Sequence, residues 1–113
     1  MAIIRAYTTI EQSRKLEEIL PIESADMRYQ AHYDNKNNLK YIPRFISTII
    51  PLRVDIPCWS LAALLSVLPP FAIDSSDDNY FRIHCQQKFS EWHNNLIDAC
   101  YEMIIKIHDL NLL

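Results

Sequence analysis

The 113-residue chain contains no glycine, although average usage predicts about eight glycines at this length. Walker-type phosphate loops, dinucleotide-binding fingerprints and the Gly-x-Ser-x-Gly nucleophile elbow all need glycine, because the backbone there approaches a phosphate or turns sharply. The missing glycine therefore excludes these three classes of site.

Paired cysteines and long apolar runs are also missing. Cys58, Cys85 and Cys100 are odd in number, widely spaced and include no Cys-x-x-Cys pair, so the sequence indicates a reducing compartment and no disulfide framework. The longest unbroken apolar run is Leu61 to Leu65, far short of the roughly 20 residues that a membrane span needs. We therefore expect a cytoplasmic protein with no membrane partner.

An excess of basic residues is the third absence. Eleven Lys and Arg against fourteen Asp and Glu give a net charge of −3, which argues against a dedicated polyanion-binding domain. Half of the residues are hydrophobic and 22% are charged, so the chain can bury enough apolar surface to fold. We expect one folded domain over residues 1–113.

The first predicted element is a short helix near the N-terminus. Thr8 or Thr9 opens it, and Thr8 with Glu11 has the spacing of a capping box. Pro21 ends it, because the residue before a proline is disfavoured in helical geometry. Its apolar stripe consists of Ile10, Leu16, Ile19 and Leu20.

A β-hairpin is predicted next. Apolar and polar residues alternate over 27–33, which is typical of a half-buried strand. The Asp/Asn-rich segment 34–38 supplies the turn, because Asn and Asp tolerate left-handed conformations. The chain then returns over about 39–45. Prolines punctuate residues 43–57, so any strand there should be short or at a sheet edge.

The second half of the chain predicts two helices and a second hairpin-like region. Ser60 is expected to cap a helix that ends at Pro69, with Trp59 packing on Leu64. Residues 80–85 alternate as a strand, with 86–93 as its partner. A last helix should run over 96–110 behind Asn95 and Asp98, which are spaced as a capping box.

These elements together predict the α+β class. We expect a single domain in which a small antiparallel sheet, formed by two hairpin-like regions, packs with about three helices.

No catalytic or metal-binding pattern emerges from the residues that could carry one. Cys58, His84, Cys85, His93 and Cys100 match no zinc spacing, and the neighbours His84 and Cys85 should point to opposite faces of a strand. We expect neither a metal nor a cofactor.

Cys58 is the best candidate nucleophile, because the dipole of the following helix would lower its pKa. No partner pattern accompanies it. An enzyme whose site is built from residues distant in sequence stays open, and a pocket around Cys58 and Trp59, or around His84, would favour that reading.

The last predicted helix carries an apolar stripe wider than one buried face requires. Such a stripe means that the helix is buried on more than one side. Either it lies between layers of its own domain, or part of it contacts a protein partner or a second copy of the chain. The predicted interface consists of Ile97, Tyr101, Ile104, Ile105 and His108.

The alternative is a weak nucleic-acid-binding accessory protein that uses the basic, aromatic region 28–53. Basic side chains for phosphates, interleaved with aromatic rings for bases, are the chemistry of single-strand binding. The residues concerned are Arg28, Lys36, Lys40, Tyr41 and Arg44.

Three segments in order, 9–27, 57–65 and 98–104, resemble a family of short uncharacterised proteins of Bacteroides-type gut bacteria, often carried on phage-like or other mobile elements. The resemblance implies a bacterial cytoplasmic or phage-associated setting. It implies no activity or catalytic residue. This chain departs from the family in having Glu91 to Asn95 where relatives have an acidic or glycine-containing turn.

Overall fold

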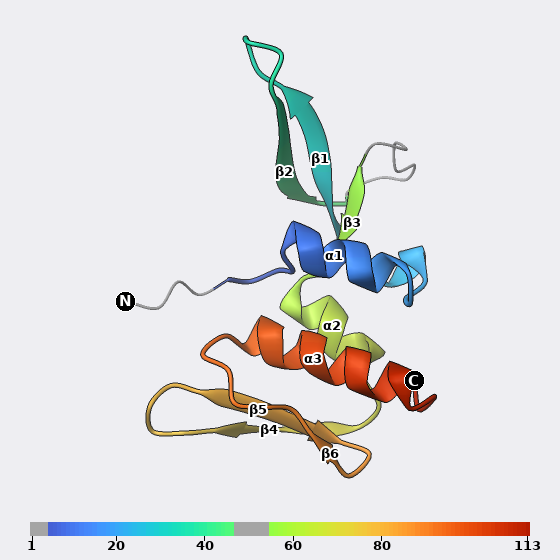
Figure 1. Cartoon of the computed structure of the whole chain (residues 1–113), viewed down its shortest axis with the longest axis vertical. Helices are drawn as coiled ribbons and strands as arrows, with labels where there is room; N and C mark the ends of the chain where they lie inside the picture. The colour runs from blue at the N-terminus through green and yellow to red at the C-terminus, as the bar shows by residue number, and fades with distance from the viewer. Residues whose placement is uncertain (1–4, 47–54) are drawn as a thin grey trace.

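The computed structural model describes residues 5–46 and 55–113 and confirms the α+β class. The described chain contains two three-stranded antiparallel sheets rather than one, and the three helices lie between them (Figure 1). No helix in the described ranges is long and apolar enough to cross a membrane.

The first helix, α1, spans Ile10–Glu17. Its cap differs from the predicted Thr8–Glu11 box by one residue. The side chain of Thr9 accepts from the backbone N–H of Gln12, and the side chain of Gln12 accepts from the N–H of Thr9. Thr8 is fully buried and takes part in a different network, described below. A short 3-10 helix, η1, follows at Ile22–Ser24.

The first sheet has the strand order β2-β1-β3. Strands β1 (Met27–Tyr33) and β2 (Leu39–Phe45) form the predicted hairpin, and Asn37 in its turn has a φ of 61°. The third strand, β3 (Ile56–Cys58), was not located in advance, because three residues with a central proline give no alternating pattern, but it is a short edge strand, as expected of any strand in 43–57. Within the range 43–57, where any strand was expected to be short or at a sheet edge, residues 47–54 lie outside the described residues.

The second helix, α2, spans Leu61–Val67 and begins as predicted, with the side chain of Ser60 accepting from the N–H of Ala63. Trp59 and Leu64 are both fully buried in the main core. Cys85 and Cys100 lie in that core as well, as expected for thiols that serve as small apolar side chains.

The second sheet has the order β4-β5-β6. Strand β5 (Phe81–Cys85) was predicted, but its longer partner is β4 (Phe71–Ser75), which precedes it and was not foreseen. The expected partner after residue 85 is only the two-residue strand β6 (Lys88–Phe89). The last helix, α3 (Leu96–Asp109), matches its prediction within one residue.

Candidate functional site

The apolar stripe of α3 is wide because the helix is buried within its own domain. It lies between α2 and the second sheet (Figure 1). Ile97 is 1% exposed and Ile104 is 0% exposed, so these two residues of the predicted interface have no surface to offer a partner. The buried side chains of α3 are Ile97, Ala99, Cys100, Met103, Ile104 and Ile107.

An open groove of about 720 Å³ runs along the remaining side of α3. Tyr101 and Ile105, two further residues of the predicted interface, line it together with Leu110. Both are half-buried, and Leu110 is exposed. His108 does not line the groove and instead has its Nδ1 at 3.4 Å from a carboxylate oxygen of Asp109. The polar lining residues are Gln12, His93, Asp98, Glu102, Lys106 and Asp109.

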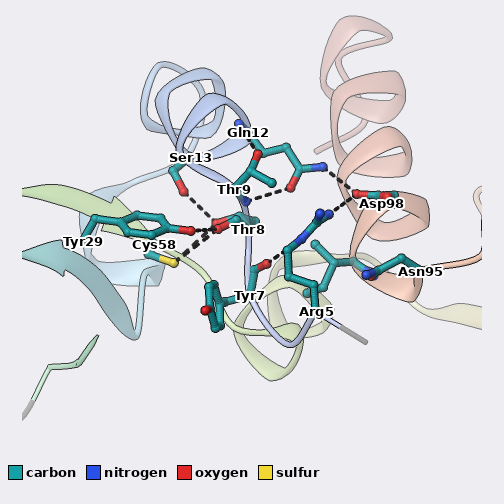
Figure 2. A network of polar contacts seen from close by, with 11 residues as sticks. Arg5, Tyr7, Thr8, Thr9, Gln12, Ser13, Tyr29, Cys58, Asn95 and Asp98 are labelled. Carbon is teal, nitrogen blue, oxygen red and sulfur yellow. Dashed lines mark hydrogen bonds and ion pairs between the residues drawn. The ribbon is translucent and has the colours of Figure 1, made fainter. Parts of the chain in front are cut away.

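One end of this groove, which we call the α3 groove, is fixed by Asp98. Asn95 caps α3 as predicted, accepting from the N–H of Ile97 at 2.8 Å, but Asp98 does not complete the predicted capping box. Its Oδ1 instead accepts from the Nε2 of Gln12 at 2.8 Å and from the guanidinium of Arg5 (Figure 2). The N-terminal segment and α1 are thereby tied to the first turn of α3.

Glu102 organises the side of the groove nearer the second sheet. Its carboxylate accepts from the N–H of Glu91 at 3.0 Å, lies 2.7 Å from Nε2 of His93 and is 3.4 Å from Nζ of Lys106. Desolvation acts to raise the pKa of Glu102, but these hydrogen bonds outweigh it and hold the pKa below its ordinary value. Glu102 is therefore a paired carboxylate rather than a proton donor near neutral pH.

The charge of the groove is negative. Its lining has three carboxylates, at Asp98, Glu102 and Asp109, against one ammonium group, at Lys106. Arg5, which does not line the groove, pairs with Asp98, so with histidine neutral the balance including this pair is −1. The floor is apolar, because Tyr101, Ile105 and Leu110 line it. An apolar floor with an acidic border can bind an apolar segment flanked by cations.

A buried polar network fastens the first sheet to α1 (Figure 2). The Oγ1 of Thr8 lies 2.7 Å from Oγ of Ser13 and accepts from the N–H of Trp59 at 3.2 Å. The hydroxyl of Tyr29 donates to the carbonyl of Thr8 at 2.6 Å, and the thiol of Cys58 donates to the same carbonyl at 3.7 Å. Sequence patterns gave no signal for this network, because its members come from distant segments.

Cys58 is not the activated nucleophile that the sequence suggested. Its side chain is fully buried, and desolvation raises its pKa, whereas a helix dipole was expected to lower it. A buried neutral thiol is a poor nucleophile.

The other candidate ligands do not converge. Cys85 and Cys100 are buried in the core, the ring of His84 stacks on Phe89 with centroids 5.0 Å apart, and His93 pairs with Glu102. Within residues 5–46 and 55–113, no group of three or more His, Cys, Asp or Glu side chains is placed to hold a metal ion.

The predicted nucleic-acid residues divide between the two faces of the first hairpin. Arg28 lies opposite Arg44 in the register and Lys40 lies opposite His32, so these basic residues share one face. Tyr41 lies opposite Ala31 on the other face and packs against the smaller core, away from the cations.

The four basic residues differ in how exposed their side chains are. The side chain of Arg28 is only 13% exposed and pairs with Asp55 at 3.4 Å. Lys36, in the turn, is exposed, as are Lys40 and Arg44. The aromatic and basic groups thus do not form one stacking surface.

Comparisons with known proteins add no relative to this picture. No protein-family model matches the chain, no curated protein matches it, and no solved structure matches its fold. The resemblance to short proteins of gut bacteria stays a prediction.

Proposed function

We propose that this chain is a non-catalytic protein-interaction module that binds a basic amphipathic helix of a partner protein in the α3 groove. The observation that carries the proposal is the groove itself, about 720 Å³ in volume, with Tyr101 and Ile105 one helical turn apart on its floor. Side chains at that spacing match the apolar positions of a docked helix, which recur every three or four residues.

The charge balance decides between a second copy and a different partner. The lining, counted with the Arg5 that pairs with Asp98, carries −1, and the whole chain carries −3. Two α3 grooves packed against each other would bring like charges together, which costs free energy. A helix with Lys or Arg beside its apolar stripe would place opposite charges next to the exposed Asp109 and near Glu102, which carries one charge against Lys106.

The test uses a fluorescent amphipathic peptide of Leu and Lys, with a matched Leu and Glu peptide of the same apolar pattern. We expect the full chain to bind the Lys peptide at least tenfold more tightly, because only that peptide complements the acidic border. Equal affinity for the two peptides would contradict the proposal, as would binding that does not weaken with added salt.

Two variants of the chain locate the binding. Ile105→Lys puts a cation on the groove floor and should weaken peptide binding by about tenfold or more. Ile22→Lys, at a 50% exposed side chain on η1, is the matched control and should leave binding unchanged. If Ile105→Lys instead converts a wild-type dimer into a monomer, the occupant is a second copy and the proposal fails.

A second candidate function is weak single-strand nucleic-acid binding by the basic face of the first hairpin. The observation in its favour is the register, which aligns Arg28, Lys40 and Arg44 on one face, with no ion pair at Lys40 or Arg44 among the described residues. Lys40→Glu with Arg44→Glu should abolish oligonucleotide binding at low salt, whereas Lys15→Glu on α1 should not. Absence of any affinity at low salt would end this alternative.

A further inference from the structure

The four outer strands of the two sheets differ in how well their open edges are protected. Natural proteins protect such edges with proline, with lysine or by making the strand very short. Strand β2 contains Pro43 and an exposed Lys40. Strand β3 has only three residues, including Pro57. Strand β6 has only two residues, and the ammonium group of Lys106 donates to the carbonyl of Phe89 in it at 2.7 Å.

Strand β4 has none of these protections. Its five residues, Phe71–Ser75, include no proline and no basic residue, and among the described strands only β5 pairs with it. Phe71 is 37% exposed and Ile73 is 41% exposed. Both lie on the face that also carries Ile83 and packs under α3, because directly paired residues share a face. The edge is therefore both open and apolar.

The hydrogen bonds of the second sheet show which backbone groups point out of this edge. The N–H of Ser76 donates to the carbonyl of Tyr80 at 2.9 Å, so even-numbered residues of β4 bond toward β5. On the far side of β5, Phe81 exchanges hydrogen bonds with His93, and the carbonyl of Ile83 accepts from Ser90. The odd-numbered residues of β5 thus bond away from β4, which agrees with even-numbered residues pairing between β4 and β5. Residues 71, 73 and 75 consequently direct their N–H and C=O groups outward.

We propose that β4 pairs antiparallel with β4 of a second copy, centred on Ile73, to form one continuous six-stranded sheet. In this register Ile73 lies opposite Ile73 of the second copy as a hydrogen-bonded pair. Phe71 lies opposite Ser75, and both positions have outward backbone groups. The edge is thus complementary to itself.

The charges on β4 do not oppose this pairing. Asp74 is the strand's single ionisable residue, and it would lie opposite Ala72 of the second copy. Its carboxylate is already paired within its own chain, with Arg82 at 2.9 Å and His84 at 3.5 Å. The self-association therefore places no unpaired charge at the new strand pair.

The helices leave room for a joined sheet. In the described contacts α3 packs on β5 and β6, so the layer above β4 is thinly covered. The two copies of β5 would be three strand spacings apart, roughly 14 Å. Packed helices need only about 8–10 Å between axes, so the two copies of α3 need not overlap. Phe71 and Ile73 of both copies would fill the space between them.

Cysteine crosslinking tests this register. Ile73→Cys should form an interchain disulfide under mild oxidation, because a hydrogen-bonded pair has a Cα separation of about 5.5 Å, within disulfide range. Ser75→Cys is the matched control, since two copies of residue 75 would lie far apart. The native cysteines are all buried and should not interfere. Equal crosslinking of both variants, or of neither, would overturn the proposal.

Charge exchange at the same residue provides a second measurement that is independent of oxidation. The wild-type chain should approach twice its 13.3 kDa mass in light scattering as the concentration rises toward about 1 mM. Ile73→Lys and Ile73→Glu should each be monomeric, and mixing them should restore the dimer. A wild-type chain that stays monomeric, or an Ile73→Lys variant that still dimerises, would refute the pairing.

Discussion

The side-chain amide of Gln12 in α1 donates a 2.8 Å hydrogen bond to the carboxylate of Asp98 in the first turn of α3. The same Gln12 accepts from the N–H of Thr9 through its other side-chain atom, so one residue both caps its own helix and positions the next layer. The guanidinium of Arg5 binds the same carboxylate oxygen. Asp98 therefore joins three segments at one end of the α3 groove.

Replacing Asp98 should destabilise the chain more than replacing another acid on the same helix. We expect Asp98→Ala to lower the free energy of unfolding by about 2 kcal/mol, because Gln12 and Arg5 both lose a charge-assisted partner. Asp109→Ala, at an exposed site near the helix end, should cost less than about 0.5 kcal/mol. Urea unfolding of both variants measures the difference, and similar costs would refute the role of Asp98.

Removing the hydroxyl of Thr8 should be costly because the group is fully buried. Thr8→Val keeps the side-chain shape but leaves the N–H of Trp59 and the hydroxyl of Ser13 without this partner. We expect a loss of about 2–3 kcal/mol in the free energy of unfolding. Thr8→Ser retains the hydroxyl and should lose less, so a Ser variant no more stable than the Val variant would argue against the network.

A glycine in the turn between β5 and β6 should increase the stability of the chain. Gln86 and Gln87 have φ values of 51° and 63°, a left-handed conformation that costs a residue with a Cβ roughly 1–2 kcal/mol. Gln87→Gly should therefore raise the free energy of unfolding by about 1 kcal/mol. Lys88→Gly, one position later in a strand, should instead lower it. Thermal melts would compare the two variants. A Gln87→Gly variant less stable than the wild type would contradict the claim that the left-handed conformation of Gln87 is strained.

Acid should weaken the chain through Glu102. Its pKa in the folded chain lies below the ordinary value of 4.5, so its contribution to stability is fully present above that pH. The contribution is lost as the pH falls through the lower, folded value. Glu102→Gln should therefore show a smaller loss of stability in acid than the wild type. Glu17→Gln, at an exposed site, is the control and should lose as much stability in acid as the wild type. The measurement is the free energy of unfolding of the three proteins between about pH 6 and pH 2.

The three cysteines should resist modification until the chain unfolds. Cys58 and Cys100 are 0% exposed and Cys85 is 4% exposed, and burial raises the pKa of Cys100 to about 12. We expect a disulfide reagent at pH 8 to label the native chain at least about a hundredfold more slowly than the chain in denaturant. Fast labelling of one native thiol would contradict this burial.

Local patterns predicted the elements that carry their own signals. The alternation over 27–33, the cap at Ser60 and the apolar stripe behind Asn95 each depend on residues within a few positions of one another. The strands β3 and β4 escaped prediction, because a three-residue strand has no period and the prolines before Phe71 concealed the start of the next one. Likewise, no rule predicts a turn from two successive glutamines.

The sequence alone determined the α+β class, most helix and strand boundaries and the exclusion of glycine-dependent sites, because these follow from spacing and composition. Only the tertiary structure decided which side of α3 stays accessible. A stripe wider than one face is compatible with burial between layers or with an exposed interface, and the packing of α2 and β5 against α3 buried Ile97 and Ile104. The α3 groove combines Gln12 and His93 with α3, and the β4 edge is open because only β5 pairs with β4 among the described strands, so neither site follows from local spacing.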